Sequence, residues 1–144
     1  RLPAILKRKG GENIMTVRSD DGMDEFSTSA TNRVCILRDD KVLMNAIDPE
    51  VVGLHKSTLK DIQIKTKEDA IKSFGGGLNN TANQAMIETT ALTGAGGLIV
   101  ANIADNFEEG VELALNTIKD GKAFKTLENF VADTGDISKL KEIV

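Results

Sequence analysis

The most informative stretch of the chain is Asp21-Gly22-Met23-Asp24-Glu25-Phe26-Ser27, which follows an apolar run at residues 13–17. The apolar run predicts a short buried strand, and Asp21-Gly22 is a common turn signal, so Asp24 and Glu25 are expected on a loop. Adjacent side chains on a strand point to opposite faces, whereas on a loop they can converge. Two converging carboxylates suit Mg²⁺, although the same pattern is also that of a solvated acidic loop.

The segments on either side of this loop predict a mixed α/β fold. A short helix that ends at Gly10-Gly11 precedes the strand at 13–17. Two further strands are expected at 33–37 and 41–47, joined by the turn Arg38-Asp39-Asp40, which predicts a β-hairpin. A helix, a strand and a hairpin in this order are typical of an α/β domain.

Residues beyond the hairpin predict helices to the end of the chain. Ser57 is expected to cap a short turn through residue 62, and Thr66 a helix that ends at the glycines 75–77. Residues 79–102 predict one long, closely packed helix, which small residues at 94–97 could break. Asn106 caps the clearest helix, whose apolar residues recur at 107, 111, 115 and 118. Helices at 122–132 and from 136 through 143 complete a single domain without a visible linker.

Composition places the chain among globular proteins of the reducing cytosol. Its 144 residues are 40% hydrophobic and 28% charged, and its net charge of −4 argues against nucleic acid or anionic membranes as partners. We find no signal peptide and no apolar run of the roughly 18 residues that a membrane span needs. The single cysteine excludes an internal disulfide framework, so a cytoplasmic location is expected.

Other residues that could carry chemistry have simpler interpretations. The glycines at 75–77 could bind an anion, but no strand precedes them as a phosphate loop requires, so a helix end is favoured. His55 lacks a recognisable Ser or Cys partner and is interpreted as a surface or turn histidine. Cys35 lies in the apolar run 34–37 and is expected to be a buried, inert thiol. No catalytic residue and no substrate-binding residue can be named from these patterns.

The loop sequence resembles the Asp-Gly-Leu-Asp-Glu-Ile-Ser signature of the anthranilate phosphoribosyltransferase family. Thr31 fits the threonine that follows this signature, residues 109–123 are similar to the family's closing helices, and residues 135–140 resemble archaeal members. Arg18-Ser19 replaces a usual His-Gly pair, and Ser29-Ala30 replaces a turn that usually contains glycine. Glu88 stands where the long helix of the family usually has Asn.

The resemblance implies that residues 1–144 form a C-terminal fragment of a phosphoribosyltransferase, from the later part of an α/β domain of the phosphoribosyltransferase and nucleoside-phosphorylase type. The N-terminal helical domain, through which the parent would form a homodimer, and the glycine-rich phosphate loop would be absent. The parent would transfer phosphoribose from phosphoribosyl pyrophosphate to anthranilate in tryptophan biosynthesis, with Asp24 and Glu25 holding Mg²⁺ against the pyrophosphate. The fragment alone would be inactive, and its first strand would belong to a larger, mainly parallel sheet.

Two alternatives stay open at this point. A nucleoside phosphorylase would share the architecture, although the Asp-Gly-Met-Asp-Glu stretch argues against it. A non-catalytic paralogue that binds nucleic acid is a different class, and the acidic balance of the chain argues against it. Fold resemblance by itself would establish neither.

Overall fold

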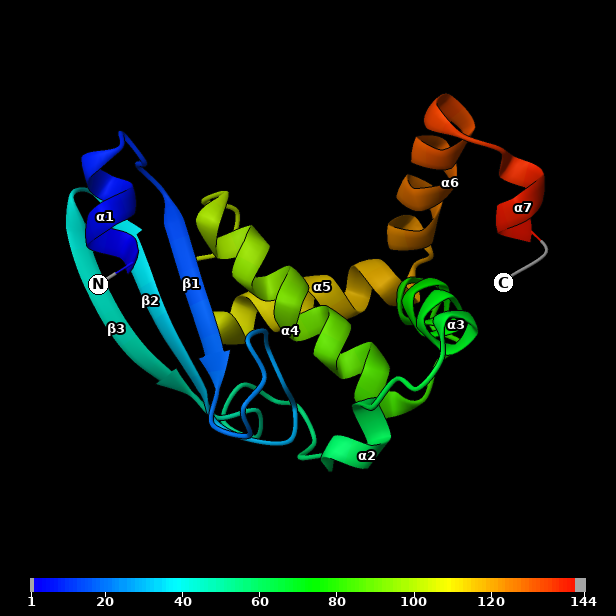
Figure 1. The fold of residues 1–144 in the computed structure, drawn as a ribbon, viewed down its shortest axis with the longest axis horizontal. Coiled ribbons are helices and arrows are strands. Elements are labelled where there is room, and N and C mark those ends of the chain that lie inside the picture. The colour runs from blue at the N-terminus through cyan, green and yellow to red at the C-terminus, as the bar shows by residue number, and fades with distance from the viewer. Residues whose placement is uncertain (1, 142–144) are drawn as a thin grey trace.

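The computed structural model describes residues 2–141, and it places a small sheet beside a group of helices (Figure 1). The helix α1 (Leu2–Arg8) leads into strands β1 (Ile14–Ser19), β2 (Asn32–Arg38) and β3 (Lys41–Ile47). The remaining helices are α2 (Leu59–Ile62), α3 (Lys67–Leu78), α4 (Gln84–Val100), α5 (Phe107–Lys119), α6 (Lys122–Thr134) and α7 (Ile137–Lys141). The predicted strand, hairpin and C-terminal helices are therefore confirmed, but the prediction that the first strand is buried is wrong, because Ile14 to Val17 are only half-buried in a sheet that the helices cover on one face.

The three strands form an antiparallel sheet in the order β1-β2-β3. Arg38 pairs with Lys41, and the two turn residues Asp39 and Asp40 have φ angles of 49° and 63°. A two-residue hairpin turn of this kind needs positive φ at both positions, which Asp tolerates better than most residues. Strand β1 pairs only with β2 within the described part of the chain, so parallel neighbours for β1 stay a prediction about a longer protein.

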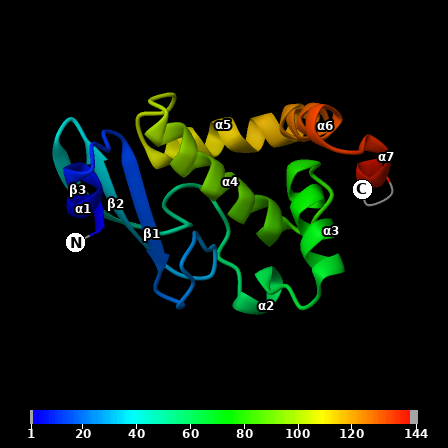
Figure 2. The same ribbon diagram turned by 45° about the horizontal axis from the view of Figure 1, so that its top comes forward.

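The main core lies between one face of the sheet and helices α4 and α5, whereas α3, α6 and α7 lie farther from the strands (Figure 2). Helices α4 and α5 approach each other closely through small residues. A Cβ added at Gly110 would lie 3.0 Å from Ala95 Cβ, and one added at Gly94 would lie 3.4 Å from Ala114 Cβ. The small residues at 94–97 therefore permit helix packing and do not break α4.

The prediction that α3 ends at the glycines 75–77 is confirmed to within one residue, since these buried glycines form the last turn and the helix ends at Leu78. A Cβ at Gly77 would lie 2.6 Å from Thr90 Oγ1 of α4, and one at Gly76 would lie 3.1 Å from Ala82 N. The glycines therefore end the helix and also permit close packing, Gly77 against α4 and Gly76 against the turn that follows. Asn80, at φ 58°, lies in the following turn, and α4 begins after Asn83 instead of at residue 79.

Smaller differences concern caps and one side chain. Thr66 and Asn106 cap α3 and α5 as predicted, but Thr58 caps α2 in place of Ser57.

The prediction that Cys35 is buried is wrong, since its side chain is only half-buried on the sheet face away from the core. The predicted apolar position at 143 lies outside the described residues. Within residues 2–141, the helices are too short or too polar to cross a membrane.

Candidate functional site: an anchored acidic loop

Asp24 and Glu25 lie on the loop between β1 and β2, as the sequence predicts, and both side chains are exposed to solvent. The backbone behind them is not at the surface. Phe26 is 5% exposed, and Ser27 and Thr28 are fully buried. The two carboxylates are therefore presented to solvent by a loop whose next three residues belong to the interior.

The first anchor of this loop is the buried side chain of Asn32, at the start of β2. Its Oδ1 accepts a hydrogen bond from the backbone N–H of Ser27 at 2.8 Å, and its Nδ2 donates to the Ser27 carbonyl at 2.9 Å. The same Nδ2 lies 3.2 Å from the carbonyl oxygen of Ala30. One amide thus satisfies both main-chain polar groups of the residue that lies two positions after Glu25.

The second anchor is Phe26, which packs against helix α4 at a glycine. A Cβ added at Gly96 would lie 2.8 Å from Phe26 Cε2 and 3.1 Å from its Cζ. The Phe26 ring also meets Phe107 edge-on, with the ring centroids 5.7 Å apart. Because Phe26 directly follows Glu25, the packing of Phe26 on Gly96 of α4 also fixes the backbone position of Glu25.

We expect Gly96→Ala to lower the free energy of unfolding by about 1–3 kcal/mol, because the new methyl group would press on the Phe26 ring in a packed core. The displacement should also lower activity of the full-length protein by moving Glu25. Thermal unfolding and steady-state kinetics would measure the two effects. Gly97→Ala is the matched control, since a Cβ there has no heavy atom within 4 Å. Equal behaviour of the two variants would contradict the anchoring role of Phe26.

A third anchor ties the loop to α4 and to the segment after β3. The Thr28 hydroxyl lies 2.8 Å from Ser57 Oγ and 3.0 Å from Thr89 Oγ1, and the Ser57 N–H donates to the Thr28 carbonyl at 3.0 Å. Ser57, expected from the sequence to be a helix cap, instead closes this contact. Three separate elements therefore fix the loop downstream of Glu25.

Upstream of the exposed pair, Asp21 organises the loop from within. Its Oδ1 accepts the Met23 N–H at 3.0 Å, and its Oδ2 accepts the Ser29 hydroxyl. Partial burial acts to raise the pKa of Asp21, but the nearby polar groups of the loop, the Ser27 and Ser29 hydroxyls and the Met23 N–H, outweigh it and lower the pKa to about 2. The Asp21 carboxylate is therefore ionised at neutral pH.

The donor set of the loop fits a weakly held hard cation. Within residues 2–141, the side chains of His, Cys, Asp and Glu do not gather in groups of three or more that could hold a metal ion. Asp24 and Glu25 would then supply two carboxylate ligands, both with hard oxygen donors. Mg²⁺ is commonly bound by one or two carboxylates together with waters and substrate phosphates, whereas structural zinc needs four protein ligands. The residues present fit Mg²⁺ in a ternary site better than a structural metal.

His55 is exposed, as predicted, but it has a buried partner that sequence reasoning missed. The Glu88 carboxylate accepts the His55 backbone N–H at 2.8 Å, and its other oxygen lies 2.7 Å from His55 Nδ1. Gln84 Nε2 also donates to Glu88, at 2.9 Å. Glu88 is the one charged residue of α4, and this isolated charge on an otherwise uncharged helix was the signal that could have found the pair.

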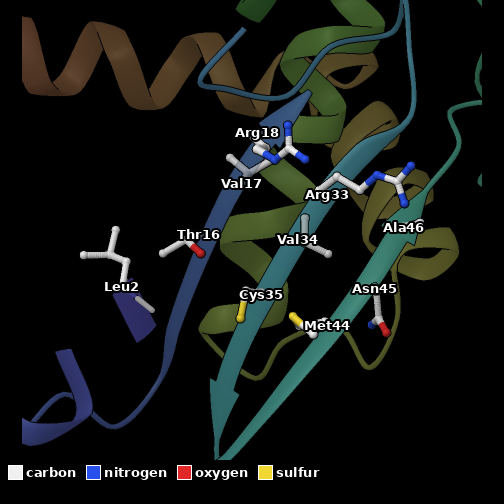
Figure 3. Close-up of a pocket in the computed structure, with 10 residues that line it drawn as sticks. All are labelled: Leu2, Thr16, Val17, Arg18, Arg33, Val34, Cys35, Met44, Asn45 and Ala46. Carbon is white, nitrogen blue, oxygen red and sulfur yellow. The ribbon is translucent and has the colours of Figure 1, made fainter. Parts of the chain in front are cut away.

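The sheet carries a separate hollow on its outer face, of about 680 Å³, which Asp24 and Glu25 do not line. Figure 3 shows Arg18, Arg33, Cys35 and Met44 on this face, which points away from α4. Met44 is 82% exposed there. The acidic loop and this hollow are therefore distinct features of the molecule.

Comparison with known proteins supports the family suggested by the loop. The family description "Glycosyl transferase family, a/b domain" matches residues 1–124. The chain is 86% identical over 143 residues to an anthranilate phosphoribosyltransferase of Nitrosopumilus maritimus, covering 99% of the chain and 41% of the relative. It is 42% identical to one of Cenarchaeum symbiosum, with the same coverage. The chain thus spans about two fifths of the length of these relatives.

Solved structures agree with the observed fold. The anthranilate phosphoribosyltransferase of Thermus thermophilus superposes with a TM-score of 0.77 at 27% identity, over 88% of this chain and 37% of that one. The yeast enzyme, solved in complex with 4-fluoroanthranilate, has a TM-score of 0.71 at 22% identity, over 91% and 37%, which shows a shared fold. The chain therefore belongs to the glycosyl transferase family, with the family's a/b domain matched over residues 1–124, and it is similar to part of the anthranilate phosphoribosyltransferases.

Proposed function

We propose that this chain is the later part of the α/β domain of a cytoplasmic enzyme that transfers phosphoribose from phosphoribosyl pyrophosphate to anthranilate, in tryptophan biosynthesis. The observation that carries the proposal is the pair Asp24 and Glu25. It is exposed on a loop anchored by the core, in a chain 86% identical to part of an archaeal anthranilate phosphoribosyltransferase. The N-terminal helical domain, which would mediate a homodimer, and the phosphate loop would belong to the parts of the protein upstream.

Asp24 and Glu25 would hold Mg²⁺ at the pyrophosphate end of the substrate. When bound, Mg²⁺ would offset the negative charge that develops on the leaving pyrophosphate. Both carboxylates are free for this task, because within residues 2–141 neither forms an ion pair or a side-chain hydrogen bond. The anchors at Phe26, Ser27 and Thr28 would keep them in place, so little backbone ordering remains to be done when substrate binds.

Purified full-length protein tests the proposal directly. Anthranilate fluorescence should disappear only when phosphoribosyl pyrophosphate and Mg²⁺ are both added, and pyrophosphate should be released in equal amount. A nucleoside phosphorylase would instead cleave a nucleoside with inorganic phosphate. A nucleic-acid-binding paralogue would leave anthranilate unchanged and bind oligonucleotides with a strong dependence on salt. Either of these two results would contradict the proposal.

A further inference from the structure

Asp21 is placed to act on the exposed pair without touching it. Its two carboxylate oxygens reach in different directions along the loop: one accepts the N–H of Met23, directly before Asp24, and the other accepts the hydroxyl of Ser29, four residues after Glu25. One side chain therefore bridges the loop from the residue before the acidic pair to a residue beyond it.

The bridge closes through two serines. Ser27 Oγ donates to Ser29 Oγ at 3.1 Å, and the Ser29 N–H donates back to Ser27 Oγ at 3.0 Å. The backbone of Ser27 is in turn held on both sides by the Asn32 amide. Met23, Asp21, Ser29 and Ser27 thus form a closed path of hydrogen bonds and backbone around Asp24 and Glu25.

The strand end gives the same loop a second tie. The Ser19 N–H donates to the Met23 carbonyl at 2.8 Å, and the Gly22 N–H donates to the Ser19 carbonyl at 3.2 Å. Both main-chain groups of Met23 are therefore occupied, one by Asp21 and one by β1. The residue before Asp24 is fixed as firmly as the residues after Glu25.

We propose that Asp21 is a positioning residue, which holds the loop in its metal-binding shape before metal or substrate arrives. The idea rests on the proposed function for its kinetic consequence, but its structural part concerns this loop alone. Asp21 is not assigned as a third metal ligand, because within residues 2–141 its carboxylate does not gather with those of Asp24 and Glu25 into a group that could hold a metal ion. Groups that orient metal ligands in this way typically change metal affinity 10–100-fold when removed, by analogy with other metal sites.

Asp20 supplies the matched control. It is the neighbouring carboxylate, and it forms an ion pair with Arg33 at 2.7 Å on the outside of the sheet. Asp20→Asn therefore removes the same charge next to the loop and leaves the Met23 and Ser29 hydrogen bonds in place. Any effect that is shared with Asp21 variants would be a long-range effect of charge.

The first measurement is amide hydrogen exchange of residues 22–29 in metal-free, full-length protein, which does not depend on activity. We expect Asp21→Ala to speed this exchange about tenfold or more, because two ties of the loop are lost. Asp21→Asn should have a smaller effect, since its amide oxygen still accepts the Met23 N–H. Ser29→Ala removes one tie and keeps the carboxylate, so it should fall between wild type and Asp21→Ala even if that variant folds poorly.

The second measurement is the Mg²⁺ concentration that gives half-maximal turnover of anthranilate, expected to rise about tenfold or more in Asp21→Ala and to stay unchanged in Asp20→Asn. Absence of turnover in wild type would refute the proposed function and leave the exchange result to decide on Asp21. Wild-type exchange in both Asp21→Ala and Ser29→Ala would overturn the positioning role. A rise in Mg²⁺ requirement that is equal in Asp20→Asn and Asp21→Ala would overturn it too, in favour of charge alone.

Discussion

Replacing Asp24 by Asn together with Glu25 by Gln is expected to lower turnover of the full-length protein about 1,000-fold. The estimate assumes that the metal held by these carboxylates contributes about 4 kcal/mol to transition-state stabilisation, at roughly 1.4 kcal/mol per factor of ten. Both side chains are exposed, so their neutral analogues should leave the thermal unfolding midpoint nearly unchanged. Steady-state kinetics and thermal unfolding of the same preparations would measure the two quantities.

Metal binding should depend on the substrate. Mg²⁺ favours six oxygens and loses its waters reluctantly, so two carboxylates alone should bind it weakly. Pyrophosphate would add further anionic oxygens. Calorimetric titration of Mg²⁺ into wild-type protein should therefore show much tighter binding with pyrophosphate present than without it, and the double variant should lose this difference. Micromolar binding of Mg²⁺ alone would contradict the ternary site.

A control for charge is available at the other end of strand β2. Asp39→Asn with Asp40→Asn removes the same two charges from the exposed hairpin turn, where both residues have positive φ and Asn is well tolerated. This variant should keep normal turnover and a normal response to Mg²⁺. Normal turnover in the Asp24 and Glu25 variant as well would show that the loop between β1 and β2 is only a solvated acidic turn.

Local sequence signals were sufficient for the elements that depend on local chemistry. The hairpin was predictable, since the strands on either side are rich in Val, Ile and Leu and the turn needs residues that accept positive φ. The caps Thr66 and Asn106 were predictable because each accepts an N–H three residues ahead. The loop position of Asp24 and Glu25 followed from the strand before it and the turn signal within it.

Features that depend on distant packing could not be predicted in the same way. The glycines at 75–77 were predicted to end α3, and they do, but their second use, the close contact of Gly77 with Thr90 of α4, was not predictable from local sequence. Gly96 likewise leaves room for the ring of Phe26, which lies seventy residues earlier in the sequence. The half-buried state of Cys35 depends on which face of the sheet the helices cover. No local pattern contains this information.

The anchors of the candidate site were missed for a related reason. Asp21 was predicted only as part of a turn and no role was predicted for Asn32, because a polar residue near a loop is usually solvated. Their partners are main-chain groups and serine hydroxyls, which leave no characteristic spacing in the sequence. Asn32 is nevertheless fully buried, and it is the anchor with the largest expected effect on stability.

We expect Asn32→Ala to lower the free energy of unfolding by about 2–4 kcal/mol. The substitution would leave the N–H and the carbonyl of Ser27 without a partner in a buried place, and each unsatisfied group costs about 1–3 kcal/mol. The loss should also release the loop that carries Asp24 and Glu25, so activity should fall together with stability. Urea and thermal unfolding of the full-length protein, followed by its circular dichroism, would measure the change.

Two further variants separate hydrogen bonding from packing. Asn32→Asp keeps the side-chain volume and the acceptor for Ser27 N–H, but at neutral pH it turns a second acceptor toward the Ser27 and Ala30 carbonyls, so it should be destabilising as well. Asn45→Ala, at an exposed position of β3, should change stability by less than about 0.5 kcal/mol. If Asn32→Asp were as stable as wild type, the volume of the side chain and not its amide hydrogen bonds would explain the stabilising effect of Asn32. If Asn32→Ala behaved like Asn45→Ala, the Asn32 amide would not be the anchor of this loop.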